Sequence, residues 1–169
     1  FSESVSGNVY AFEPVLENYI LAQICAENNN LRNVFLYNSA LSSNIFNLRI
    51  NTIDESGVHS GGGSCISNVG SLCSSLTVDL FNLNDLKLIQ LDVEGHELEA
   101  LTGSLETINR CRPLIAVEDN NDECSPFFQK NNYDYYISIP GLSIWVPSEK
   151  TTFPRQKEYF AAETPRLYL

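Results

Sequence analysis

The stretch Leu91-Asp92-Val93-Glu94-Gly95-His96-Glu97-Leu98 decides how this chain is expected to fold. It follows the apolar run Leu86–Leu91 and opens a helical pattern, so a carboxylate stands where a strand ends and a helix begins. The stretch Val9-Tyr10-Ala11-Phe12-Glu13-Pro14 has the same design. Buried strands of open α/β sheets emerge in this way at a ligand crevice. Both carboxylates are therefore expected at one edge of a parallel sheet.

The remaining apolar patterns alternate between strand and helix, which predicts a mostly parallel sheet with helices on both faces. Ile45–Ile53 alternates loosely and predicts an antiparallel excursion, whereas two apolar runs around Pro140-Gly141 predict a C-terminal antiparallel hairpin. We expect one α/β domain over residues 1–150 and an irregular tail over 151–169. The expected strands are Asn8–Phe12, Asn33–Tyr37, Leu76–Leu80, Leu86–Leu91, Leu114–Val117, Tyr135–Ile139 and Leu142–Val146, and the expected helices are Val15–Asn28, Glu94–Asn109 and Ser125–Lys130.

Composition excludes several classes of partner. The 169 residues carry a net charge of −11, which disfavours binding to nucleic acid or to an anionic membrane surface. No apolar stretch approaches the roughly 18 residues that a membrane span needs. The five cysteines include no Cys-x-x-Cys pair, which favours a reduced cytoplasmic protein over a disulfide framework or a zinc site.

The first residues, Phe1-Ser2-Glu3-Ser4-Val5-Ser6-Gly7, are typical of the end of a helix followed by a glycine stop. Because the chain also contains no methionine, we interpret it as a fragment or a processed chain. The glycines of Gly61-Gly62-Gly63-Ser64 suit a surface loop or, less readily, a loop that closes over a ligand. His59 lies in a polar stretch and is expected in solvent.

Four motifs follow one another along the chain: Val9–Pro14, Asn33-Val34 with Asn38–Ser42, Leu91–Gly103 and Arg112–Glu118. In this order they resemble the FkbM-type S-adenosylmethionine-dependent methyltransferases. The resemblance covers roughly Gly7 to Glu118, and its most specific part is the Asp-Val-Glu-Gly-His-Glu stretch.

The resemblance implies a class I methyltransferase fold with a Rossmann-like sheet. It also implies S-adenosyl-L-methionine as the cofactor and O-methylation of a hydroxyl on a sugar or small natural product. In sequence, the family's first strand and Gly-rich loop would precede Phe1; in the sheet, that strand would lie between the strands at Val9 and Leu86. Upstream residues, a completing chain or a homo-oligomer would fill the position, or this piece binds no cofactor. Gln90 stands where the family commonly has a lysine.

The resemblance also implies site residues. Glu13, with Pro14 beside it, would accept the ribose hydroxyls of the cofactor, or would act only as a helix N-terminal carboxylate. Ser39 and Ala40 would leave room for adenine, or are ordinary turn residues. Asp92 would orient the cofactor's amino group or the substrate hydroxyl.

The catalytic candidates are Asp92, Glu94 and His96, and Glu118 is expected to face the substrate. Glu94 or His96 would act as a general base, although both suit a helix N-terminus equally well. We expect no metal, since three ligands so close in sequence rarely converge.

Two other functions stay open. A degenerate methyltransferase fold would serve as a non-catalytic binding or assembly module, which the missing Gly-rich loop favours. An NAD-type oxidoreductase would use Glu13 on a dinucleotide ribose.

Overall fold

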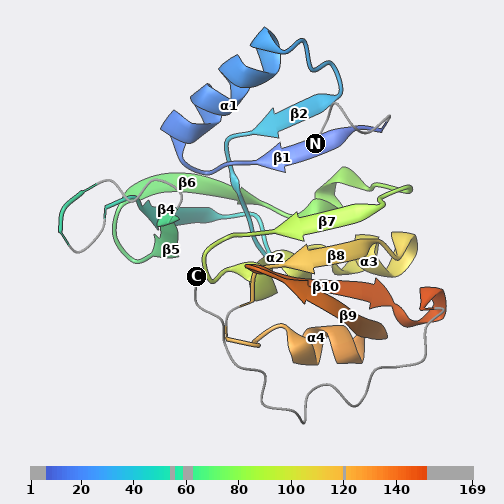
Figure 1. Cartoon of the computed structure of the whole chain (residues 1–169). Coiled ribbons are helices and arrows are strands. Elements are labelled where there is room, and N and C mark those ends of the chain that lie inside the picture. The colour runs from blue at the N-terminus through green and yellow to red at the C-terminus, as the bar shows by residue number, and fades with distance from the viewer. Residues whose placement is uncertain (1–6, 54–55, 59–62, 120, 152–169) are drawn as a thin grey trace.

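A computed structural model describes residues 7–53, 56–58, 63–119 and 121–151. The α/β class is confirmed, but the sheets are mixed and not mostly parallel. The strands form three sheets, ordered β1-β2, β3-β6-β4-β5 and β7-β8-β10-β9 (Figure 1). The strands span Val9–Phe12 (β1), Val34–Tyr37 (β2), Ala40–Leu41 (β3), Asn47–Asn51 (β4), Cys65–Ser67 (β5), Ser71–Leu76 (β6), Leu88–Leu91 (β7), Leu114–Val117 (β8), Tyr133–Ile139 (β9) and Leu142–Pro147 (β10). The helices span Leu16–Asn28 (α1), Glu97–Thr102 (α2), Leu105–Cys111 (α3) and Ser125–Lys130 (α4), with 3-10 turns at Val78–Phe81 (η3) and Ser148–Lys150 (η4).

The parallel pairs are β1 with β2, β3 with β6, and β7 with β8. The predicted excursion over Ile45–Ile53 is confirmed as β4, which pairs antiparallel with β5 and β6. The predicted hairpin is also confirmed, because β10 lies antiparallel to both β9 and β8. The expectation of a mostly parallel sheet fails because the segment between β2 and β7 builds a sheet of its own.

The core lies between the strands β7, β8 and β10 and the helices packed against them. Apolar side chains from these strands meet α2, α3 and α4, and the Phe128 ring stacks on Trp145 with centroids 4.3 Å apart. The core comprises Ile89, Leu91, Ala100, Leu101, Ile108, Ile115, Val117, Cys124, Phe128, Tyr133 and Trp145. Burial of these residues holds the carboxyl ends of β7 and β8 in place.

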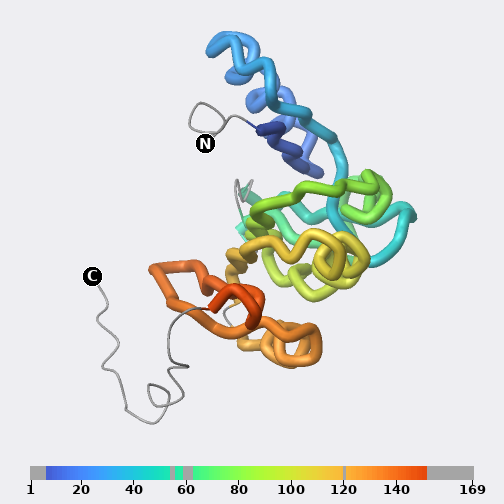
Figure 2. Tube along the Cα trace, turned by 90° about the vertical axis from the view of Figure 1, so that its right-hand side faces the viewer, coloured from blue at the N-terminus to red at the C-terminus, as the bar shows by residue number. Residues whose placement is uncertain are grey.

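The strands β1 and β2 form a separate unit with α1. In the side view this unit lies at one end of the molecule, and α4 with the hairpin lies at the other (Figure 2). Among the described strands, β1 pairs only with β2 and β7 pairs only with β8. The apolar face predicted for α1 is present, but Leu16, Ile20 and Ile24 are each about half exposed.

Two predicted elements are wrong. Leu76–Leu80 is not a strand, because Thr77 Oγ1 accepts a hydrogen bond from Leu80 N (3.2 Å) and starts η3. The single helix expected over Glu94–Asn109 is two helices that meet at Gly103. Asp79 stabilises this break, since its carboxylate accepts from the backbone N–H groups of Glu106 (3.0 Å) and Thr107 (2.7 Å) at the start of α3.

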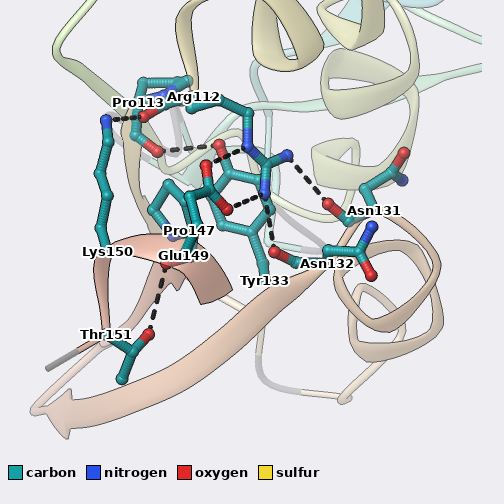
Figure 3. A network of polar contacts seen from close by, with 9 residues as sticks. All are labelled: Arg112, Pro113, Asn131, Asn132, Tyr133, Pro147, Glu149, Lys150 and Thr151. Carbon is teal, nitrogen blue, oxygen red and sulfur yellow. Dashed lines mark hydrogen bonds and ion pairs between the residues drawn. The ribbon is translucent and has the colours of Figure 1, made fainter. Parts of the chain in front are cut away.

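A polar network ties the last described turn to the domain (Figure 3). The Arg112 guanidinium donates to both carboxylate oxygens of Glu149, at 2.8 and 3.0 Å, and to the carbonyls of Asn131 and Asn132. It also lies over the Tyr133 ring, 4.5 Å from the centroid. One side chain thus joins α3, α4, β9 and η4. The expected tail over 151–169 lies outside the described residues, apart from Thr151.

Candidate active site

Two carboxyl side chains meet where β7 and β8 end. The parallel register pairs Leu91 with Val117, and Glu118 N donates to the Leu91 carbonyl at 2.9 Å, so Asp92 and Glu118 leave the two strands as neighbours. Their side chains share a hydrogen bond. That bond, together with desolvation and the negative charge of Glu118 and Glu94, raises the pKa of Asp92 to about 6. Asp92 therefore titrates about two pH units above an ordinary aspartate.

The buried side chain of Glu97 stabilises the turn after Asp92. Its carboxylate is buried, and Oε1 accepts hydrogen bonds from the backbone N–H groups of Val93 and Gly95, both at 3.2 Å. Glu94 and Gly95 take positive φ angles of 52° and 88°, which turn the chain sharply into α2. The turn leaves the Glu94 side chain exposed on the same edge as Asp92.

A small cavity opens beside this pair. Its volume of about 90 Å³ is the room of roughly three water molecules, enough for one functional group of a ligand. Its described lining contains carboxylates and no lysine or arginine. The lining residues are Glu94, Gly95, Glu97, Leu98, Glu118, Asp119, Asn121, Glu123 and Cys124.

Asp119 lines the wall of the cavity, and its carboxylate oxygens bind backbone N–H groups. Its carboxylate accepts from the backbone N–H groups of Glu123 (2.9 Å) and Cys124 (2.8 Å), which starts the turn into α4. The Cys124 thiol is buried behind that wall. Desolvation first, then the charge of Asp119, raises its pKa to about 12, so the thiol stays protonated.

His96 lies at the start of α2, and its side chain is only 14% exposed. Its Nε2 is 3.0 Å from the Ser42 hydroxyl, and its Nδ1 is 3.7 Å from the Glu99 carboxylate. Burial lowers the pKa of His96, although Glu99 and Glu97 oppose this effect. The ring is therefore held neutral between two partners.

The residues predicted to hold a cofactor lie at the ends of β1 and β2. Glu13 Oε1 accepts a hydrogen bond from Val15 N at 2.8 Å, which places the carboxylate at the start of α1. Asn38 joins the two strand ends, because its Nδ2 donates to the carbonyls of Glu13 (2.9 Å) and Pro14 (3.2 Å). Ser39 is buried, and its Oγ has no hydrogen-bond partner within the described residues.

The predicted site residues thus fall into two groups. Glu94 and Glu118 line the acidic cavity, and Asp92 joins them through its hydrogen bond with Glu118. Glu13, Pro14, Ser39 and Ala40 lie apart from this group and do not line the cavity. Ala40 begins β3, opposite Ser75 of β6, instead of lying in a turn. His59 and Gly61-Gly62 lie outside the described residues.

Sequence reasoning missed Ser42, Glu97 and Asn38 as residues that shape the site. The sequence position of Glu97 did indicate such a role, since an acidic residue at a helix start often accepts hydrogen bonds from the free backbone N–H groups there. Asn38 and Ser42 lie in a motif of the family resemblance, but no local spacing indicated the contact of Ser42 with His96, which is 54 residues away. In the described ranges no cluster of three or more histidine, cysteine or acidic side chains is arranged to hold a metal ion. None of the described helices is both long enough and apolar enough to cross a bilayer.

Comparison with known proteins bears on the fold and the family of this chain. No curated protein matches the chain. A crystal structure of methyltransferase FkbM from Methylobacillus flagellatus KT has a similar fold, with a TM-score of 0.59 at 15% sequence identity. The match covers 83% of this chain but only 36% of that one, so this chain spans little more than a third of the length of its structural neighbour. The model of the methyltransferase FkbM domain matches residues 3–135, and the chain therefore belongs to the FkbM methyltransferase family.

Proposed function

We propose that this chain forms the catalytic part of an S-adenosylmethionine-dependent methyltransferase that methylates a hydroxyl of a sugar or small natural product. The observation that supports this most strongly is the hydrogen-bonded pair Asp92–Glu118 at the adjoining ends of β7 and β8. Ligands of open α/β sheets bind at the carboxyl ends of the strands. The position of the pair supports a role in deprotonating an acceptor hydroxyl.

The residues at the ends of β1 and β2 suit a nucleoside-like cofactor. The buried Ser39 Oγ without a partner is a free hydrogen-bonding group at the place assigned to adenine. Glu13 uses Oε1 at the helix start and keeps its second oxygen for the ribose hydroxyls. Glu13, Pro14, Ser39, Ala40 and Asp92 would hold S-adenosylmethionine, which when bound supplies an electrophilic methyl group.

The proton of the acceptor hydroxyl would go to the Asp92–Glu118 pair. A carboxylate whose pKa is raised to about 6 is a stronger base than an ordinary one and is still ionised at neutral pH. Glu94 lines the same cavity as Glu118, and Glu118 would contact the acceptor. The sequence also suggested His96 as the base, but both of its ring nitrogens face protein groups.

The acidic cavity favours a neutral or cationic acceptor. A phosphate or carboxylate near Glu94, Glu118 and Glu123 would be repelled. We expect the acceptor to be a small molecule or a glycan and the protein to work in the cytoplasm. We also expect a further strand, from the rest of the protein or from a second copy, to pair with the open edges of β1 and β7.

Isothermal titration calorimetry tests the proposal. S-adenosylmethionine, its demethylated product and NAD would each be titrated into this chain and into a form extended upstream. Micromolar binding of the first two, weakened by Glu13→Gln, is the expected result. Binding of neither by either form would overturn the proposal and favour a non-catalytic module. Binding of NAD alone would favour an oxidoreductase.

A further inference from the structure

We propose that Ser42 and His96 form a positioning pair that fixes the cofactor-side segment Ser39–Ser42 against the turn Asp92–Glu97. The description of Ser39–Ser42 as the cofactor side rests on the proposed function. The contact itself does not, because it is a hydrogen bond of 3.0 Å between side chains that lie 54 residues apart.

Ser42 is held from several directions. It is fully buried, and its N–H donates to the Leu76 carbonyl at the end of β6 (2.9 Å). Its own carbonyl oxygen lies against Gly103, where an added Cβ would come within 2.0 Å. Since α2 begins after His96 and ends before Gly103, Ser42 contacts both ends of this six-residue helix. The segment that begins at the buried Ser39 is thereby tied to α2.

The same geometry assigns the proton on the imidazole. The Glu99 carboxylate lies 3.7 Å from Nδ1 and favours a proton there, so Nε2 is the acceptor and the Ser42 hydroxyl is the donor. Protonation of Nε2 would leave the buried hydroxyl without an acceptor, which agrees with the lowered pKa of His96. Glu97 and Glu99 are the charged groups that act on the ring.

This arrangement separates positioning from proton transfer. A general base needs a ring nitrogen that reaches the substrate, but Nε2 is taken by Ser42 and the side chain is only 14% exposed. His96 instead sets the position of Glu94 and Gly95 in the turn after β7, and Ser42 sets the position of Ser39 and Ala40. The pair thus controls the distance between the two groups of site residues.

The test compares His96→Ala, Ser42→Ala, the double variant and His96→Gln in the 169-residue chain. The glutamine carbonyl retains an acceptor for the Ser42 hydroxyl without a group that titrates near neutral pH. We expect the alanine variants, single or double, to shift the backbone amide NMR signals of both Ser39–Ala40 and Asp92–Glu94. The His96→Gln spectrum should stay near wild type. Binding of S-adenosylhomocysteine should fall roughly tenfold in the alanine variants only.

Two results would overturn the proposal. Amide shifts confined to α2 would show a local structural contact, and equal damage by His96→Gln and His96→Ala would show that the imidazole itself is required. Ser42→Ala, which removes one oxygen atom, is the second variant if His96→Ala does not fold. If the wild type binds no S-adenosylhomocysteine, the proposed function fails, while the NMR comparison still decides the role of the pair.

Discussion

At the scale of single residues, the Asp92–Glu118 pair gives this chain an unusual pH response. Two carboxyl groups that share a hydrogen bond share one proton, so the folded state holds that proton more tightly than the unfolded chain does. The pKa of Asp92 is raised in the folded state. The pair's contribution to stability is therefore full below pH ~4 and is lost as the pH rises through about 6.

Glu118→Gln removes the shared proton and one negative charge. We expect the pKa of Asp92 to fall from about 6 toward its ordinary value near 4, as measured by ¹³C NMR of the carboxyl carbons. The variant should also lose less stability than the wild type between pH 4 and 7. Glu123→Gln is the matched control, since it removes a charge from the same cavity without contributing to the shift of Asp92. An unchanged Asp92 titration in Glu118→Gln would show that the two groups are not paired.

At the scale of elements, the junction of α2 and α3 depends on close backbone packing at Gly103. A Cβ there would lie 2.0 Å from the Ser42 carbonyl oxygen, so backbone must move to admit alanine. We expect Gly103→Ala to lower the free energy of unfolding by about 1–3 kcal/mol in urea denaturation. Gly63→Ala should change it little, because no atom of the described residues lies within 4 Å of a Cβ added at that position. Equal stability of the two variants would contradict the packing.

These elements also show what sequence could and could not predict. The strands at Val9, Val34, Leu88 and Leu114 were predicted because short apolar runs end at polar residues. The placement of Asp92 beside Glu118 followed from parallel strands ending at one edge, where Glu94 and Glu118 line the cavity. The break at Gly103 could not be predicted, since Asp79 caps α3 from 27 residues upstream. The Ser42–His96 contact is likewise long-range and follows no local spacing.

At the scale of the whole molecule, Arg112 joins the end of the described chain to the domain (Figure 3). Its bidentate contact lowers the pKa of Glu149 to about 2, so this pair contributes stability above pH ~4 that is lost as the pH falls through about 2. Lysine cannot make the same fork, and Arg112→Lys should cost about 1–3 kcal/mol at pH 7 in thermal or urea unfolding. Lys87→Met removes an exposed ion pair with Asp85 and should cost almost nothing. Equal costs would mean that the Arg112 contacts add no stability.

The unit of α1, β1 and β2 is joined to the rest of the described chain through rings rather than through a strand ladder. Phe81 of η3 packs edge-on against Tyr10, Phe12 and Tyr37, with centroids 5.7, 5.6 and 5.0 Å apart. Because β1 and β7 share no ladder, these contacts should carry much of the coupling between the unit and the core. We expect Phe81→Ala to speed amide hydrogen exchange across Val9–Tyr37 while β7 and β8 keep their protection. Leu80→Ala changes an exposed neighbour in the same turn and should leave both regions unchanged. Equally faster amide exchange in β7 and β8 would show that the described chain unfolds as one cooperative body. The contacts of Phe81 would then not be a separate link between the α1-β1-β2 unit and the core.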